Sequence, residues 1–411
     1  MFSKQLLFVC LISLNLFSGC ANGQAEEATC LNQEESSAQI QVLKPEQKPL
    51  FRIVQNGKLG FIDNTGRIVI KPKFELDKVG NFSENRAALG GKNGKWGFID
   101  NTGKVIVLPQ FENVAQFSEQ RAAVKQNGKW GFIDLNGKIV VKPQFNNVSL
   151  FIEQRSAVQK GYLWGFIDRD GKFIVEPKFT GYTNFSEGLA GFESYENNQD
   201  KSGFIDTSGR VVIELKNVNP DIEGLGFTNG LAPVWVRNPG IWGIINGILD
   251  ETGRGRKFWG FINRSGQITI PLKYDYAFNF QDCLAAVVVN DKYGYINTFG
   301  KMVIQPQFEE LLRFSEGLAD FQLNQKYGYI DKNGKVVITP QFIKTFGFSE
   351  GLASVKTESG KWGFINRQGN IVIKPQFDEV SNFSFGLARV RIGKKYGYID
   401  KHGKYVWNLS N

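Results

Sequence analysis

The chain has 411 residues, 42% of them hydrophobic, and a formal net charge of +9. This composition is that of a folded protein and does not suggest intrinsic disorder. The single histidine, His402, cannot supply a Ser-His-Asp or Cys-His catalytic site or a histidine metal centre. We therefore expect no catalytic residues, no metal and no cofactor.

Residues 1–19 have the pattern of a secretory signal peptide. Lys4 gives a basic start, an apolar stretch runs from Leu6 to Phe17, and small residues follow. The apolar stretch is too short to span a bilayer as a permanent helix. We expect this segment to direct export and then to be removed.

The residues Phe17-Ser18-Gly19-Cys20 resemble the lipobox of bacterial lipoproteins. The resemblance implies that Cys20 is acylated, becomes the new N-terminus and holds the protein on the membrane. Ala21 stands where an Asp would retain such a protein in the inner membrane, so we expect the outer membrane if the cell has one. Ordinary secretion, with an incidental Cys20, is the alternative.

Residues 20–49 are predicted to form a tether that carries the lipidated Cys20. They are polar and without periodicity, and they bury too little apolar surface to fold. Of the other cysteines, Cys10 leaves with the signal peptide, while Cys30 and Cys283 remain. The compartment permits a disulfide, and whether these two pair is left open at this point.

From residue 50 to residue 411 the chain repeats one pattern. Each copy holds a glycine, usually after an aromatic residue, at Gly60, Gly97, Gly131, Gly165, Gly203, Gly260, Gly294, Gly328, Gly363 and Gly397. Eight of the nine spacings are 34 to 38 residues, and the spacing from Gly203 to Gly260 is 57. A fixed period of this length indicates an array of one supersecondary unit.

Each unit is predicted to form a three-stranded antiparallel meander. In one copy the strands are Ala122–Val124, Trp130–Asp134 and Lys138–Val141. Asn127-Gly128 is a two-residue turn that needs positive φ. We expect Pro143 to end the ladder because it has no N–H to donate.

The side chains of this unit suggest how it packs. Alternation places Trp130 and Phe132 on one face and Gly131 on the other, where a missing side chain leaves room for a neighbouring backbone. Phe145 and Phe151 recur in nearly every unit and should fill the gaps between adjacent meanders.

One meander buries too little apolar surface to stand alone, so the units must stack. No segment looks like a strand that closes a ring, since the first unit opens with its own first strand at 51–54 and the last ends with its own third at 404–409. We predict an all-β fold in which about ten meanders form an open or spiralling β-solenoid. A closed, propeller-like ring is the alternative.

The pattern resembles the WG-repeat family of bacterial proteins, also called KWG repeats, over residues 50–411. The resemblance implies a β-rich module of secreted or envelope proteins, with no established catalytic residues. Leu59 and Ser202 depart from the pattern because the aromatic residue is lost there, so those units should pack more loosely.

The second strand of each unit ends in Asp or Asn. Asp stands at Asp63, Asp100, Asp134, Asp168, Asp206, Asp331 and Asp400, and Asn stands at Asn263, Asn297 and Asn366. Asn cannot replace a general acid or a charged metal ligand, whereas both residues can accept hydrogen bonds in a turn. We therefore predict a structural role for this position.

Two basic positions recur in each unit. One precedes the aromatic residue, at Lys58, Lys95, Lys129, Lys201, Lys292, Lys326, Lys361 and Lys395. The other follows the turn glycine, at Arg67, Lys104, Lys138, Lys172, Arg210, Lys301, Lys335 and Lys404. These two rows are either solvated turn residues or a docking surface for anionic phospholipid, acidic glycan or an acidic partner. Nucleic acid is not expected outside the cytoplasm.

Three early units carry Arg86, Arg121 and Arg155 where later units have leucine. Arginine binds carboxylates and phosphates with two parallel hydrogen bonds, so these residues are a candidate anion site. Neutral divergence between the units is the alternative.

The insert 237–257 is the largest irregularity of the array. Ile241, Trp242 and Ile245 give it an apolar face. Long loops in regular arrays are often functional, and exposed apolar clusters mark interfaces. We expect a partner to bind here; folding back onto the array is the alternative.

These features predict a lipid-anchored, extracytoplasmic module that binds or scaffolds in the bacterial envelope without catalysis. Its expected partner is an envelope protein or an anionic glycan or lipid surface, held by many weak contacts along a rigid array. A purely structural envelope protein is an alternative, and an enzyme acting on cell-wall glycans is a less favoured one.

Overall fold

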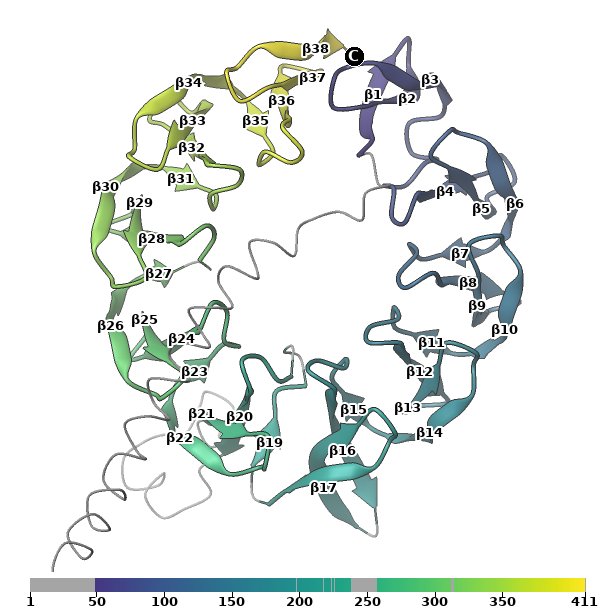
Figure 1. The fold of residues 1–411 in the computed structure, drawn as a ribbon, viewed down its shortest axis with the longest axis vertical. Helices are drawn as coiled ribbons and strands as arrows, with labels where there is room; N and C mark the ends of the chain where they lie inside the picture. Colours follow the sequence, from purple (N-terminus) through teal and green to yellow (C-terminus); the bar gives the residue numbers. More distant parts are fainter. Residues whose placement is uncertain are drawn as a thin grey trace, which may run out of the picture. The chain divides into compact units, whose positions relative to one another are not determined.

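The computed structural model describes residues 49–410 except 197, 217, 223, 225, 238–256, 312 and 313. In these residues the regular secondary structure consists of β-strands, which form ten small antiparallel sheets. Figure 1 shows the sheets following one another around a ring, like the blades of a propeller. We number them blade 1 to blade 10 in chain order. Within the described ranges there is no helix that could cross a membrane.

The strands have the following bounds. Blades 1 and 2 have three strands each: β1 (Phe51–Gln55), β2 (Lys58–Ile62) and β3 (Ile68–Phe74); β4 (Arg86–Gly90), β5 (Trp96–Asp100) and β6 (Val105–Phe111). Blades 3 to 6 have four strands each. Blade 3 consists of β7 (Asn113–Val114), β8 (Ala122–Gln126), β9 (Lys129–Ile133) and β10 (Ile139–Phe145), and blade 4 of β11 (Asn147–Val148), β12 (Arg155–Lys160), β13 (Leu163–Asp168) and β14 (Phe173–Phe179). Blade 5 consists of β15 (Gly181–Tyr182), β16 (Leu189–Glu196), β17 (Gln199–Asp206) and β18 (Val211–Leu215), and blade 6 of β19 (Asn219–Pro220), β20 (Leu231–Arg237), β21 (Lys257–Asn263) and β22 (Ile268–Tyr274). Blades 7 to 10 also have four strands each. Blade 7 consists of β23 (Tyr276–Ala277), β24 (Leu284–Val289), β25 (Lys292–Asn297) and β26 (Met302–Phe308), and blade 8 of β27 (Glu310–Leu311), β28 (Leu318–Leu323), β29 (Lys326–Asp331) and β30 (Val336–Phe342). Blade 9 consists of β31 (Lys344–Thr345), β32 (Leu352–Lys356), β33 (Trp362–Asn366) and β34 (Ile371–Phe377), and blade 10 of β35 (Glu379–Val380), β36 (Ala388–Ile392), β37 (Lys395–Ile399) and β38 (Tyr405–Ser410).

Blade 3 shows how one unit folds. The predicted three-strand meander is confirmed by β8, β9 and β10, and the tip residues Asn127 and Gly128 have φ of 51° and 73°. The two-residue strand β7, which pairs with β8, was not predicted. The prediction that Pro143 ends the ladder is wrong, because β10 continues to Phe145 with a register shift after Val141. A proline is tolerated there because β10 is the edge strand of its sheet.

The glycine of the aromatic-glycine pair is needed within the blade. A Cβ added to Gly131 would lie 2.4 Å from the Val141 carbonyl oxygen and 2.6 Å from the Pro143 nitrogen. The backbone of β10 therefore packs directly on Gly131, as predicted. Comparable close approaches recur at Gly97, Gly165, Gly203, Gly260, Gly294, Gly328 and Gly363.

Aromatic rings hold neighbouring blades together. Phe132 of blade 3 meets Phe151 at the start of blade 4 edge-on, with ring centroids 4.9 Å apart. Phe145 and Phe151 are both almost fully buried, so they fill the gaps between meanders as predicted. The same contact recurs at 4.8 to 5.2 Å in the pairs Phe61–Phe82, Phe98–Phe117, Phe166–Phe185, Phe204–Phe227, Phe261–Phe280, Tyr295–Phe314, Tyr329–Phe348 and Phe364–Phe383. Such pairs stabilise a fold by about 0.5–1.5 kcal/mol beyond their buried area.

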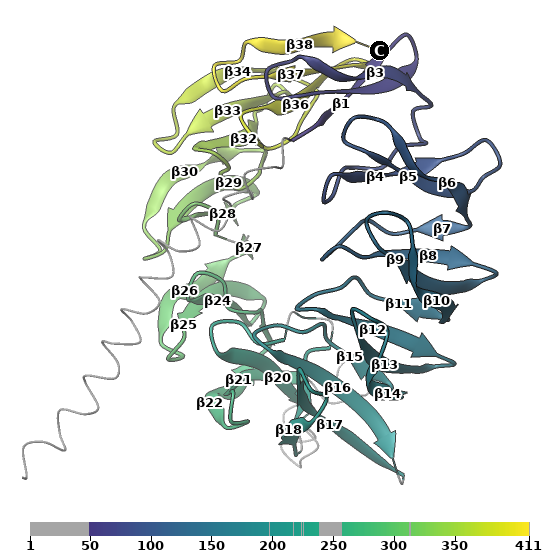
Figure 2. The same cartoon turned by 45° about the vertical axis from the view of Figure 1, so that its right-hand side comes forward.

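The two ends of the array meet. The Tyr398 hydroxyl donates to the Arg52 carbonyl at 3.0 Å, and its ring lies 5.4 Å from that of Phe51. The Ser410 hydroxyl donates to the Val54 carbonyl at 2.7 Å. In Figure 2, β38 accordingly lies next to β1.

The open or spiralling array that we favoured is therefore not what the structure shows, and the alternative, a closed ring, is correct. At the regular junctions the turn glycine of one blade covers an aliphatic side chain of the previous one, as Gly137 covers Val107. Gly66 of blade 1 covers Val406 of blade 10 in the same way. Closure thus uses the contact that joins the other blades and needs no extra strand.

Candidate binding surfaces

The three predicted arginines lie at successive junctions and not at one common site. Their Nε atoms donate to a turn carbonyl of the next blade: Arg86 to Leu135 at 3.1 Å, Arg121 to Arg169 at 3.0 Å, and Arg155 to Thr207 at 3.1 Å. One terminal nitrogen of each also donates to the carbonyl of the preceding residue. The structure thus gives them a role in joining blades, and anion binding stays a prediction.

At later junctions the positively charged residue lies on the second of the two neighbouring blades and not on the first. Arg264 in the turn of blade 6 reaches back to Glu187 of blade 5, with nitrogen and carboxylate oxygen 3.6 Å apart. The corresponding pairs are Lys332–Asp282 at 3.7 Å, Arg367–Glu316 at 4.0 Å and Lys401–Glu350 at 3.2 Å. Early and late junctions therefore differ in which of the two neighbouring blades carries the positively charged residue.

A second chain of hydrogen bonds runs around the ring. At Glu84, Glu119, Glu153, Glu187, Glu316 and Glu350, a carboxylate accepts a backbone N–H from the corresponding turn of the next blade at 2.7 to 3.0 Å. The hydroxyls of Ser83, Ser118, Ser186, Ser315 and Ser349 donate to a phenylalanine carbonyl of the next blade at 2.6 to 2.7 Å. The bonds to the carboxylates are charge-assisted and therefore among the stronger ones, and together with the serine bonds they link neighbouring blades.

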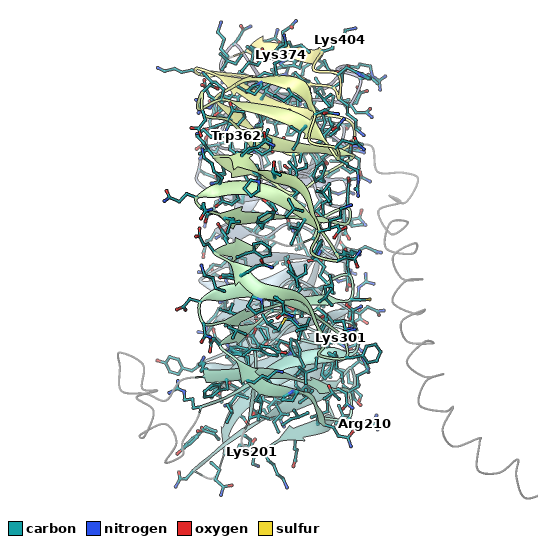
Figure 3. All side chains as sticks on the ribbon, turned by 90° about the vertical axis from the view of Figure 1, so that its left-hand side faces the viewer. Lys201, Arg210, Lys301, Trp362, Lys374 and Lys404 are labelled. Carbon is teal, nitrogen blue, oxygen red and sulfur yellow. The ribbon has the colours of Figure 1, made fainter. Side chains whose placement is uncertain are left out.

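The two predicted basic rows lie on opposite faces of the ring. In Figure 3, Lys201 of the first row lies toward one face, and Arg210, Lys301 and Lys404 of the second row lie along the other. Several members of the first row are paired with an acid: Lys58–Glu75 at 2.5 Å, Lys95–Glu112 at 3.9 Å, Lys201–Glu196 at 3.0 Å, Lys326–Glu358, and Lys361–Asp378 at 2.5 Å. Much of the charge of the first row is therefore compensated locally.

We call the second row the turn row. It consists of the exposed residues Arg67, Lys104, Lys138, Lys172, Arg210, Lys301, Lys335 and Lys404. Within the described part of the chain only Arg67 and Arg210 form ion pairs, each with the aspartate of its own turn. Exposed apolar side chains stand at the next position in most blades, and Ile68, Val105, Ile139, Val211, Ile268, Val336 and Ile371 are 40% to 54% exposed.

The aspartates of these turns serve the backbone. The Asp134 Oδ1 accepts the N–H groups of Asn136 and Lys138, both at 2.9 Å. In blade 1 the Thr65 hydroxyl and N–H and the Arg67 side chain donate to Asp63 and hold the pKa of its carboxyl below its usual value. Asn263 accepts the same backbone bonds in blade 6. The predicted structural role of this position is confirmed.

A pocket of about 690 Å³ opens between blades 5 and 6. In blade 3, Trp130 pairs across the sheet with Phe145, whereas in blade 5 the corresponding pair is Ser202 with Leu215. Two large rings are thus missing from one interface. The Ser202 hydroxyl donates to the Val218 carbonyl at 3.2 Å, and the pocket is further lined by Glu193, Asn219, Trp235 and Val236.

Charged groups surround this pocket. Asp200, Lys201 and Arg237 line it and are exposed. Burial raises the pKa of Glu193, with Lys257 opposing the shift and Asp200 adding to it. No hydrogen bond reaches the Glu193 carboxylate from the residues that the structure describes. Sequence reasoning missed this site, although the loss of the aromatic residue at Ser202, together with Leu215 at the position that proline holds in blade 3, could have indicated it.

The other predicted site residues lie outside the described residues. These are the lipidation site Cys20 and the insert residues Ile241, Trp242 and Ile245. Cys283, in the turn before β24, is disulfide-bonded. Among the described side chains no three His, Cys, Asp or Glu residues are grouped so as to hold a metal ion.

A family model described as WG containing repeat matches eight segments of the chain. They are 60–96, 96–130, 130–164, 164–196, 259–293, 293–327, 327–362 and 362–396. The chain belongs to the WG-repeat family. No curated protein is similar enough to give a match.

Several solved structures resemble this WG-repeat protein at low identity. The designed protein Ika8 is 12% identical with a TM-score of 0.36, over 70% of this chain and 95% of its own. BamB from Moraxella catarrhalis is 11% identical with a TM-score of 0.34, over 80% of this chain and 95% of its own. Dipeptidyl peptidase 4 from Porphyromonas gingivalis is 10% identical with a TM-score of 0.40, over 80% of this chain and 59% of its own. Similarity at this level says nothing about function.

The matched WG repeats leave residues 197–258 uncovered. Most of the pocket lining, including Ser202, Leu215 and Val236, falls in this gap. The pocket therefore lies where the WG pattern is interrupted.

Proposed function

We propose that this WG-repeat protein is a lipid-anchored, non-catalytic binding module that docks face-on to anionic phospholipid head groups of the bacterial envelope. The observation that carries the proposal is the turn row, a set of exposed cations on one face of a closed ring. Six of its eight members form no ion pair within the described residues.

A closed ring lets these cations act together. Because the turn row follows one face, its members can meet a flat surface at the same time. Each Lys or Arg near an anionic lipid surface contributes about 1 kcal/mol. Many weak contacts on one rigid body combine without further ordering cost, which is the advantage of multivalent binding.

The chemistry around the turn row favours a lipid surface. The turn aspartates direct their oxygens at backbone N–H groups, as Asp134 does, while the lysines extend into solvent. An exposed apolar residue such as Ile139, beside Lys138, can enter the boundary between head groups and acyl chains.

The proposed anchor complements this surface. A single acyl chain holds a protein only marginally, whereas two or more chains hold it stably. Acylation of Cys20 is inferred from its lipobox-like context. With that anchor the ring would stay close to the membrane, on the outer membrane if the cell has one.

The proposal is tested with residues 20–411 carrying Cys20→Ser, so that neither the apolar stretch of residues 1–19 nor a lipid can bind the vesicles. Co-sedimentation with phosphatidylglycerol vesicles is compared for two triple variants. Lys138, Lys301 and Lys404 changed to Gln should weaken binding about 100-fold, from about 1 kcal/mol each. The control changes Lys71, Lys142 and Lys374 to Gln, which removes the same charge from β3, β10 and β34, the third strands on the outside of the ring in Figure 1.

Equal losses in the two triple variants, or equal binding to neutral phosphatidylcholine vesicles, would contradict the proposal. Binding to an acidic glycan in the absence of vesicle binding would also overturn it in favour of a different envelope partner.

A further inference from the structure

Regular interfaces contain an aromatic residue that fills the wedge between two blades. Trp164 of blade 4 packs on Tyr182 in the short strand β15 of blade 5, with ring centroids 4.6 Å apart. Trp259 of blade 6 packs on Tyr276 in β23 of blade 7 at the same distance. At these two interfaces the second-strand aromatic residue and the short strand of the next blade form one packed unit.

The interface between blades 5 and 6 lacks these parts. The second-strand residue is Ser202, its cross-strand neighbour is Leu215, and the next short strand offers Asn219 and Pro220. Ser202 lies on the same strand face as Phe204, which contacts Phe227 at the start of blade 6 at 4.8 Å. The missing ring would therefore have pointed into the pocket, whose volume is within the range of ligand sites.

We propose that this pocket receives a tryptophan side chain from a partner protein. The space is the one that the repeat elsewhere fills with its own indole, and Leu215, Val218 and Val236 offer apolar contact for such a ring. Glu193 supplies a carboxylate, without a hydrogen-bond partner among the described residues, that can accept the indole N–H. This site is independent of the turn row.

A protein partner is favoured over a small molecule because of the surface beside the pocket. Strands β16 and β17 have eight residues each, compared with five each for β8 and β9 in a regular blade. The longer hairpin carries Asp200 and Lys201 past the pocket, and Arg237 stands on the other side. These charges can bind residues that flank a tryptophan in a peptide chain.

The test uses the full chain and two probes, N-acetyltryptophanamide and the capped peptide Ser-Lys-Trp-Glu-Ser, whose charges match Asp200 and Arg237. Binding is followed by NMR line broadening and by calorimetry. The peptide should bind about tenfold more tightly than the amide because the flanking charges add contacts. The same peptide with Leu in place of Trp is the probe control and should not bind.

Two variants place the binding in the pocket. Ser202→Trp combined with Leu215→Phe places two rings at a cross-strand pair, as Trp130 and Phe145 are in blade 3, so the chain should fold and lose peptide binding. Glu193→Gln should weaken binding about tenfold, since a charged hydrogen-bond acceptor is replaced by a neutral one. Retained binding in the double variant, or equal affinity for amide and peptide, would overturn the proposal.

The substitution Trp242→Ala distinguishes between two occupants of the pocket, a tryptophan of a partner protein and Trp242 of the chain itself. Trp242 lies outside the described residues and follows the repeat pattern in sequence. If the peptide binds only after this substitution, the occupant is the chain's own tryptophan and the partner proposal fails. Equal binding before and after the substitution supports it.

Discussion

Blade 3 and blade 5 have the same strand order and differ in one layer of the interface that follows them. The contact between phenylalanine rings, which we call the inner layer, is the same in both interfaces, with ring centroids 4.9 Å apart for Phe132 and Phe151 and 4.8 Å apart for Phe204 and Phe227. The outer layer is filled by the Trp130–Phe145 pair in blade 3 and hollow at Ser202 and Leu215 in blade 5. The inner ring pair is thus sufficient to keep blades in register, and the outer layer is available for function.

The largest expected effect tests the layer that the two blades share. Phe132→Ala and Phe204→Ala should each lower the free energy of unfolding by about 4 kcal/mol, because each deletes a fully buried ring. Denaturant unfolding of the two variants measures the losses. A much smaller loss for Phe204→Ala would show that the inner layer does not hold blade 5.

Removing the second-strand aromatic residue from a regular blade should lower the free energy of unfolding by less than the phenylalanine substitutions do. Trp164→Ser in blade 4 removes a half-buried indole that packs on Tyr182, and should lower the unfolding free energy by about 3 kcal/mol. The same variant should bind a second molecule of N-acetyltryptophanamide at blade 4, in addition to the one expected in the pocket between blades 5 and 6, and calorimetry measures the stoichiometry. Without such binding, a missing ring is insufficient to make a site.

A second departure from the regular blade is Asp320, which stands where blade 3 has Ala123. Burial raises the pKa of Asp320, with the Thr345 hydroxyl opposing and Glu310 adding, and its Oδ1 has no hydrogen-bond partner among the described residues. A raised pKa means that the folded state holds the proton more tightly, so stability falls as pH rises through that pKa. Asp320→Asn should remove this decline and stabilise the fold at pH 8 by about 1 kcal/mol.

Thermal unfolding between pH 4 and pH 8 measures that change. Asp291→Asn, at an exposed tip, is the control and should leave the profile unaltered. Parallel profiles for wild type and Asp320→Asn would refute the assignment.

The smallest expected effect concerns the turn of blade 5. The Ser208 hydroxyl and the Arg210 side chain hold the pKa of Asp206 below its usual value. Its contribution is therefore present above the ordinary pKa of an aspartate and is lost as pH falls through the lowered one. Asp206→Asn should cost about 0.5 kcal/mol at pH 7, since Asn263 makes the same backbone bonds in blade 6.

Unfolding midpoints at pH 7 and pH 3 test this, and the difference between wild type and variant should shrink at the lower pH. The reverse change, Asn263→Asp, serves as the matched control. It should add a contribution to the free energy of unfolding, in the turn of blade 6, that is lost at low pH.

Features set within one unit could be predicted from the sequence. The turn at Asn127-Gly128, the close packing on Gly131 and the capping by Asp134 depend on residues a few positions apart, whose preferences are local. Pro143 was misread because its effect depends on whether its strand is an edge strand, which the unit alone does not specify.

Relations between units could not be predicted in the same way. The cross-blade bonds of Arg86 and Arg155 join residues 49 and 52 positions apart, and one repeat viewed alone does not reveal these partners. The pocket was missed for the same reason, since Ser202 predicts looser packing but not the size or charge of the space that results.

The sequence by itself determined the β-repeat unit, its family and the two rows of basic residues, because each follows from a pattern repeated every 34 to 38 residues. Only the tertiary structure decided that the array closes, through the Tyr398 and Ser410 contacts with the first blade. The physical reason is that closure depends on the small rotation between blades summed over ten junctions, and no single unit encodes that sum. The same rotation decides that the turn row lies on one face of a ring.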